Sequence, residues 1–399
     1  VNAFAEAYGV GSWGFALLAL DVRGHGESGG LVTVAGSREV ADVRVVRDWL
    51  AARPEVSDTA IGVWGISYGG GIALNSLVAG VPWRAVVVVE TWTDLADALV
   101  PQGLLKSGLA AALLGSVPES RRDPALSALL TSALAGRPAP VLSWARERSS
   151  LERLGAVSTP VLLAQGRRDF LFGFDQGARA FQRLRGPKAL YLGLHGHTPS
   201  TFPAADTALL MERTRAWFDC HLRSVLCDSA RRVVHVVPET FRGQALRLTA
   251  LPPTRSTTFA LPGVTTIAQR GEVVRATAPL RSAIEIFGSP TVTTSVAASG
   301  GWSRLVAVLT ARTPQGRELV VSTGGVPTRP GAQRVTIRLV AQATTIPRGA
   351  RLTLTLASSS TAQASSNLLY LDLPMPPSAR LRVGPAILRL PVLRTGKTS

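Results

Sequence analysis

The segment Gly65-Ile66-Ser67-Tyr68-Gly69 has the residue types of a serine nucleophile held on a sharp turn. It follows a predicted strand at 60–64 and precedes a predicted helix at 69–78, which is the context that a nucleophile elbow requires. The two glycines let strand and helix approach without a side-chain collision. The pattern predicts that Ser67 attacks a carbonyl carbon and that the backbone N–H of Tyr68 points at the developing oxyanion.

A serine hydroxyl is a weak nucleophile and needs a base that a third group orients. In hydrolases with this elbow the chain order is Ser, then Asp or Glu, then His. Asp169 follows a predicted strand at 161–165, at the strand end where sites form on open parallel sheets, so we predict it as the acid. Asp175 and Glu90, which directly follows a predicted strand at 85–89, are the alternatives.

Two histidines are candidates for the base. His195-Gly196-His197 follows a predicted strand at 189–194, at the same edge of the sheet as Asp169. The pattern does not choose between His195 and His197. We expect the unused one to hydrogen-bond to the loop backbone.

The loop Asp21–Ser28 also holds a histidine, His25, which precedes Ser67 in the chain. We interpret this loop as structural, with Asp21 and Arg23 making hydrogen bonds near the site. His25 is therefore not the predicted base.

The elements that must position these side chains alternate over residues 1–230. Apolar runs predict strands at 15–20, 60–64, 85–89, 161–165 and 189–194, and helical spacing predicts helices at 1–8, 38–52, 69–78 and 207–222. This alternation predicts a mostly parallel sheet covered on both faces. Together with the serine elbow, it favours an α/β-hydrolase domain. Residues 95–150 are rich in Leu and Ala, and we expect them to form a helical cap over an acyl pocket with Trp92 and Trp144 as candidate wall residues.

Residues 231–399 have a different pattern, with short alternating runs separated by turns. Strands are predicted at 232–237, 283–287, 291–296, 305–310, 335–339, 352–356 and 369–373. Many short strands at regular spacing predict an all-β sandwich. The expected organisation is a hydrolase domain at 1–230 followed by this sandwich.

The composition of the chain limits the classes of partner that we expect it to bind. The net charge is +17, but the arginines that carry most of it are scattered along the chain, so we expect no nucleic-acid partner. No apolar run approaches the roughly 20 residues that a membrane span needs. Cys220 and Cys227 could form a small disulfide loop or remain two free thiols, and they lack metal-ligand spacing. We predict no metal and no organic cofactor.

These residues together resemble the Xaa-Pro dipeptidyl-peptidase and cocaine-esterase family of α/β-hydrolases. The resemblance covers nearly the whole chain and rests on seven segments: Asp21–Ser28, Gly65–Gly69, Gly166–Phe170, His195–Ser200, Arg215-Ala216-Trp217-Phe218, Gly288-Ser289-Pro290 and Pro347-Arg348-Gly349. The last two resemble the family's carboxy-terminal jelly-roll domain. The second histidine of the loop matches the family's base, so the resemblance favours His197.

The resemblance implies a serine hydrolase that cleaves a small-molecule ester or peptide through an acyl-enzyme, of the esterase or Xaa-Pro dipeptidyl-peptidase type. A bacterial source, possible secretion and a homodimer are further expectations. In related proteins, strands before the first helix include one whose loop supplies a second oxyanion donor, whereas this sequence begins at that helix. The alternative is therefore a catalytically impaired, truncated homologue whose β-sandwich acts as a binding module.

Overall fold

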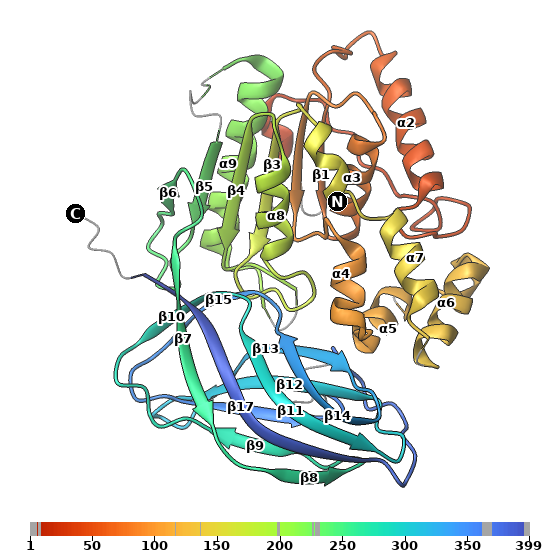
Figure 1. The fold of residues 1–399 in the computed structure, drawn as a ribbon. Helices are drawn as coiled ribbons and strands as arrows, with labels where there is room; N and C mark the ends of the chain where they lie inside the picture. Colours follow the sequence, from red (N-terminus) through yellow and green to blue (C-terminus); the bar gives the residue numbers. More distant parts are fainter. Residues whose placement is uncertain are drawn as a thin grey trace.

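The computed structural model describes residues 6, 9–115, 117–135, 137–197, 200–225, 227, 232–360 and 369–394. Figure 1 shows a helix-covered sheet joined to a region built of strands alone. Nearly all of the helix predicted at 1–8, and Thr198-Pro199 of the histidine loop, lie outside the described residues. No helix in the described part of the chain combines the length and apolar character that crossing a bilayer requires.

The first sheet has six strands in the order β1-β2-β3-β4-β5-β6. Their bounds are β1 Gly62–Ile66, β2 Ala85–Val89, β3 Val161–Gly166, β4 Lys188–Gly193, β5 Arg232–Val236 and β6 Leu246–Leu248. Strands β1 to β5 pair in parallel, and β6 is antiparallel to β5. Every residue of β2 is buried, as expected for a strand covered on both faces.

The helices of this region form two groups. Those between or after the strands are α2 Ser37–Ala51, α3 Tyr68–Val78, α8 Asp175–Arg183 and α9 Ala204–Arg223. Residues 95–150 form α4 Leu95–Leu99, α5 Ser107–Gly115, α6 Pro124–Leu134 and α7 Ala139–Glu147, with no strand in their described part. Short 3-10 helices cover Val10–Trp13, Pro101–Gly103, Glu119–Arg121 and Leu151–Ala156. Figure 1 shows α4 to α7 gathered beside the β-stranded region.

Local sequence explains where the helices of 95–150 begin. The Asp123 carboxylate accepts a hydrogen bond from the Ala125 N–H, and Pro124 occupies the first position of α6. In the same way, the Asp94 carboxylate accepts the Asp97 N–H at the start of α4. Each acidic cap satisfies a backbone donor that the helix leaves unpaired.

Two antiparallel sheets form the C-terminal region. The first contains β14-β11-β17-β10-β15, with β7 and β8 also pairing with β17, and the second is β13-β12-β16-β9. The bounds are β7 Thr254–Leu261, β8 Thr265–Ala268, β9 Val273–Ala276, β10 Ile284–Gly288, β11 Thr291–Ser299, β12 Arg304–Arg312, β13 Glu318–Pro327, β14 Gly331–Arg338, β15 Gln342–Ile346, β16 Arg351–Ala357 and β17 Arg380–Leu393. Buried residues of both sheets form one core, among them Ile286, Val292, Leu388, Leu305, Val321 and Leu354. The predicted fold class, an α/β-hydrolase sheet followed by a β-sandwich, is confirmed.

Two predicted strands are wrong. Residues 15–20 form no strand in the described structure, and Leu17, Leu18 and Leu20 are 55%, 42% and 36% exposed. Strand backbone must pair with a neighbour, and no described residue pairs with 15–20. Residues 369–373 also form no strand; the Tyr370 carbonyl accepts the Ser360 N–H at 2.9 Å.

The strand predicted at 232–237 is present as β5, but it joins the first sheet beside β4. The first sheet therefore continues, through β6, into residues that the sequence pattern had assigned to the sandwich. The division of the chain into domains at 230 remains a prediction. Cys220 and Cys227, left open by the sequence, form a disulfide.

Arg167 links the two regions from the loop after β3. Its side chain is 1% exposed, donates a hydrogen bond of 2.6 Å to the Val237 carbonyl, and pairs with Glu285 of β10. Its backbone carbonyl accepts the Ala343 N–H. The ring contact between Phe174 and Phe287, at 4.9 Å between centroids, lies at the same junction.

We predict that Arg167→Met lowers the free energy of unfolding by about 3 kcal/mol, because it leaves a carboxylate and buried carbonyls without their donor. Chemical denaturation followed by fluorescence measures the change. The matched control is Arg270→Met, whose pair with Asp372 involves an Arg side chain 86% exposed and should cost less than about 1 kcal/mol. Equal effects of the two substitutions would contradict this role for Arg167.

Candidate active site

The Ser67 turn joins the end of β1 to the start of α3. Ser67 has φ 50° and ψ −114°, a conformation that costs a non-glycine residue on the order of 1–3 kcal/mol. Its backbone N–H donates to the Val89 carbonyl at 2.8 Å, and its carbonyl accepts the Thr91 hydroxyl at 2.7 Å. A β-carbon on Gly65 would lie 2.4 Å from the Gly69 carbonyl oxygen, so this close approach requires glycine.

His197 connects Ser67 to Asp169. Its Nε2 lies 2.8 Å from Ser67 Oγ, and its Nδ1 lies 2.6 Å from Asp169 Oδ2. Asp169 is fully buried, and its Oδ1 accepts the N–H groups of Leu171 and Phe172 at 2.8 and 3.0 Å. A carboxylate fixed in this way accepts the Nδ1 proton, which leaves Nε2 free to accept the Ser67 hydroxyl.

The pKa of His197 is raised above its usual 6.5. Burial acts to lower it, but the charge of Asp169, the hydrogen bond to Asp169 and the charge of Glu90 outweigh burial. The Phe172 ring packs edge-on against the imidazole, with centroids 5.4 Å apart. Sequence reasoning did not single out Phe172, although an aromatic residue three positions after the acid was a visible signal.

The other candidate histidines lie elsewhere. His195 is fully buried, and its Nδ1 lies 3.1 Å from Asp206 Oδ2. It was expected to bond to loop backbone; instead its ring meets a side-chain carboxylate of α9. The His25 ring packs on Tyr68, with centroids 5.3 Å apart, and its Nδ1 lies 3.2 Å from the Arg23 carbonyl.

The two alternative acids take different positions. Glu90 is 1% exposed, and its Oε2 lies 4.0 Å from His197 Nδ1, farther than Asp169. Asp175 begins α8 and pairs with Arg179 at 4.0 Å. Of these three acids, Asp169 alone has a carboxylate oxygen within hydrogen-bond distance of His197.

The Tyr68 backbone N–H is at the first position of α3, where a helix leaves donors unpaired. Within the described residues it has no acceptor. The phenol lies in a separate network, because its oxygen accepts the Ala35 N–H and donates to Glu39, both at 3.3 Å. Burial raises the pKa of Tyr68, so the phenol stays neutral.

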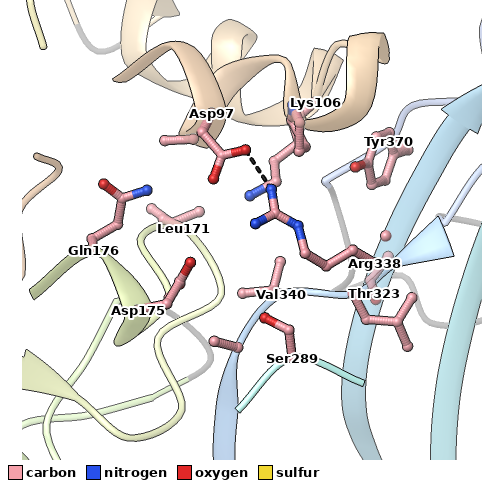
Figure 2. Close-up of a pocket in the computed structure, with 16 residues that line it drawn as sticks. Asp97, Lys106, Leu171, Asp175, Gln176, Ser289, Thr323, Arg338, Val340 and Tyr370 are labelled. Carbon is pink, nitrogen blue, oxygen red and sulfur yellow. Dashed lines mark hydrogen bonds and ion pairs between the residues drawn. The ribbon is translucent and has the colours of Figure 1, made fainter. Parts of the chain in front are cut away.

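The structure contains two notable cavities, and neither is lined by Ser67, His197 or Asp169. The cavity in Figure 2 lies between α4, the loop after Asp169 and the β-sandwich, and its charged groups include Asp97, Asp175, Lys106 and Arg338. Its acids and bases balance, with Arg338 paired to Asp97. Burial lowers the pKa of Lys106 to about 8.

The second cavity is apolar throughout and lies within the helices of residues 95–150. Its lining residues are Val34, Leu99, Ala110, Leu113, Leu126, Leu129, Leu130, Ala133, Val141 and Trp144. Trp144 therefore borders this cavity, and its role as a wall residue of an acyl pocket remains a prediction. Trp92 does not border it: it is 1% exposed, packs on Tyr68 and Phe172, and donates its indole N–H to the Arg148 carbonyl.

A metal-ligating set exists among the described residues, in Glu90, Asp169 and His197, which each offer one ligand atom within 4.8 Å of the others. A metal ion there would need His197 Nδ1 and Asp169 Oδ2 as ligands, but these two atoms are hydrogen-bonded to each other at 2.6 Å. The donor set therefore serves the histidine–carboxylate pair better than it serves a cation.

Known proteins share this architecture. The sequence of residues 10–199 matches the family described as X-Pro dipeptidyl-peptidase (S15 family). No curated protein sequence matches the chain significantly. A CocE/NonD family hydrolase from Staphylococcus aureus superposes with a TM-score of 0.70 at 13% identity, covering 93% of this chain and 79% of that one.

Two further solved structures align over similar lengths. An alpha-amino acid ester hydrolase has a TM-score of 0.64 at 17% identity, covering 93% of this chain and 85% of that one. An aminopeptidase from a marine sediment archaeon, Thaumarchaeota archaeon, has a TM-score of 0.61 at 15% identity, covering 94% and 85%.

The helix-covered parallel sheet with its serine turn defines an α/β-hydrolase. Residues 10–199 are similar in sequence to the X-Pro dipeptidyl-peptidase (S15) family, and the chain shares its two-part fold with the CocE/NonD family hydrolase and the alpha-amino acid ester hydrolase. It is a hydrolase of the esterase or peptidase type.

The raised pKa of His197 makes a pH prediction. A base must be neutral, so kcat/KM should fall as pH drops through that pKa, with its half-maximal point above 6.5. Asp169→Asn removes the carboxylate charge and the charged acceptor of the His197 Nδ1 proton. The pH of half-maximal kcat/KM should therefore fall, and kcat should drop about 10³- to 10⁴-fold. A pH–rate profile of both proteins measures this, and an unchanged acid limb in the variant would rule out Asp169 as the orienting acid.

Proposed function

We propose that this protein hydrolyses carboxylic esters or amides of small molecules through an acyl-enzyme. Ser67 is the nucleophile, His197 the base and Asp169 the orienting acid. One observation carries the proposal: an unbroken hydrogen-bonded line runs from Ser67 Oγ through His197 to buried Asp169, with distances of 2.8 and 2.6 Å.

The reaction follows from this line. Ser67 Oγ attacks the carbonyl carbon while its proton passes to His197 Nε2, and the imidazolium is stabilised by Asp169. The same proton then passes to the leaving alcohol or amine as its bond to the carbonyl carbon breaks. Water next attacks the acyl-enzyme and gives a proton to His197. The bond between the carbonyl carbon and Ser67 Oγ then breaks, His197 returns that proton to Oγ, and the carboxylic acid leaves.

The oxyanion formed in each step needs preorganised donors. The Tyr68 N–H, unpaired at the start of α3 and adjacent to the nucleophile, is the donor we assign. Such a donor contributes on the order of 100- to 1000-fold in rate. The turn that strains Ser67 also aims this N–H, so nucleophile and donor are positioned by one piece of backbone.

Substrate class follows from the apolar cavity within residues 95–150. A cavity lined by Leu, Val, Ala and Trp favours an apolar acyl or alkyl group. Val34, in its lining, precedes Ala35, whose N–H donates to the Tyr68 hydroxyl, so the cavity wall is tied to the residue beside the nucleophile. We therefore favour an esterase for apolar acyl groups, with release of Xaa-Pro dipeptides as the alternative within the family.

The direct test is fluorophosphonate labelling of the protein and of Ser67→Ala, with p-nitrophenyl acetate and Gly-Pro-p-nitroanilide turnover read in parallel. We expect labelling and turnover to vanish in the variant, with kcat lower by at least about 10⁴-fold. The faster substrate separates esterase from peptidase. A folded wild-type protein that takes no label would overturn the catalytic proposal and favour a binding role for the sandwich.

The cavity makes a separate prediction. Trp144→Ala should enlarge it and shift the preference among p-nitrophenyl esters toward longer acyl chains, by about 10-fold in relative kcat/KM. Trp49→Ala is the control, because Trp49 is 51% exposed on α2. An unchanged chain-length preference in Trp144→Ala would show that this cavity is not the acyl site.

A further inference from the structure

Glu90 is a buried acid that the proposed reaction does not use. It directly follows β2, at the sheet edge that also carries Ser67, Asp169 and His197, and its side chain is 1% exposed. Its φ is +50°, a left-handed conformation that is costly for glutamate. Burying a carboxylate on strained backbone costs free energy that an apolar residue would not cost, which points to a role for its charge.

Two imidazoles face Glu90. Its Oε2 lies 4.0 Å from His197 Nδ1, and its Oε1 lies 3.7 Å from His195 Nε2. On the far side of His195, Nδ1 meets Asp206 Oδ2 at 3.1 Å. The cluster therefore runs Asp206, His195, Glu90, His197, Asp169.

The hydrogen bonds of Asp206 indicate which nitrogen of His195 carries a proton. Asp206 already accepts the N–H groups of Leu194 and His195 and the hydroxyl of Tyr191, so it is an anion to which His195 Nδ1 donates its proton. Its pKa is lowered, because hydrogen bonds and the His195 charge outweigh burial. Within the described residues, His195 Nε2 and Glu90 Oε1 are both buried without a hydrogen-bond partner. At 3.7 Å these two atoms are too far apart for a hydrogen bond, so Glu90 faces both imidazoles as a neighbouring charge.

We propose that Glu90 is a positioning residue for His197: a second carboxylate that holds the imidazole beside Asp169 and stabilises the imidazolium as it forms. His195, fixed by Asp206, holds Glu90 in place from the other side. This inference rests on the proposed function, because it acts through His197 as the base.

The charge state of Glu90 suits this role. Burial is the main reason that its pKa is raised to about 7; Asp169 and Asp206 raise it further, while His195 and His197 lower it. In mildly alkaline solution Glu90 is ionised and adds its charge to that of Asp169 next to His197. In acid it becomes neutral, and His197 loses one of its two carboxylates.

The test compares wild type, Glu90→Gln and Glu90→Asp by the rate of fluorophosphonate inactivation as a function of pH. This rate requires an activated serine but no knowledge of the substrate. Gln retains the shape and can donate to His195 Nε2, so the cluster stays filled. The control is Glu152→Gln, which removes an exposed carboxylate (76% exposed) paired with Arg183.

We expect Glu90→Gln to react about 10-fold more slowly at pH 8 and its acid limb to lie about one pH unit lower, since one unit of pKa corresponds to a tenfold change. Glu90→Asp should retain part of both. In an Asp169→Asn background, Glu90→Gln should remove most of the residual rate, because Glu90 is then the remaining carboxylate at His197.

Other outcomes distinguish the role proposed for Glu90 from the proposed reaction itself. If folded Glu90→Gln and Glu90→Asp both keep the wild-type rate and acid limb, Glu90 only packs, and the inference is wrong while the reaction stands. If Glu90→Gln does not fold, an unchanged profile in folded Glu90→Asp has the same meaning. If wild type itself takes no label, the proposed function fails first.

Discussion

The backbone turn at Ser67 is the constraint on which the site depends. With φ at 50°, the serine is lifted off the end of β1 and the chain enters α3 at once. The turn requires a close approach that only glycine permits. A β-carbon on Gly65 would lie 2.4 Å from the Gly69 carbonyl oxygen, and one on Gly71 would lie 2.3 Å from the Trp92 ring. Trp92, expected to line a pocket, is instead the surface against which the start of α3 is pressed.

The parallel sheet then brings the other groups to the same place. The carboxyl ends of β1, β2, β3 and β4 are followed by Ser67, Glu90, Asp169 and the histidine loop. Parallel strands present these ends at one edge, so residues more than a hundred positions apart meet there. Burial is the main reason that the pKa of Glu90 is raised. The pKa of His197 is raised against the effect of burial, by the charges of Asp169 and Glu90 and the hydrogen bond to Asp169.

Much of this could be predicted from the sequence, since a glycine-flanked serine, an acid after a strand and a histidine loop each carry a local pattern. The residue pattern alone left His195 and His197 open, and only the family resemblance favoured His197. The pattern carried no signal that Asp206, eleven residues away in α9, binds His195. Strand β17 escaped prediction because Gly384, Pro385 and Pro391 interrupt its pattern. Residues 15–20 have strand-like composition, but composition cannot supply the neighbouring strand that pairing requires.

The claim that Ser67 becomes acylated is tested most directly by stopped-flow mixing with p-nitrophenyl acetate, followed by acid quench and peptide mass mapping. The account predicts a burst of p-nitrophenol approaching one equivalent per active site when deacylation is slower than acylation, and an acetyl group on the peptide that contains Ser67 in the quenched sample. Turnover of the ester with the acetyl group on any other residue, or with no acetylated peptide under conditions that show a burst, would contradict it.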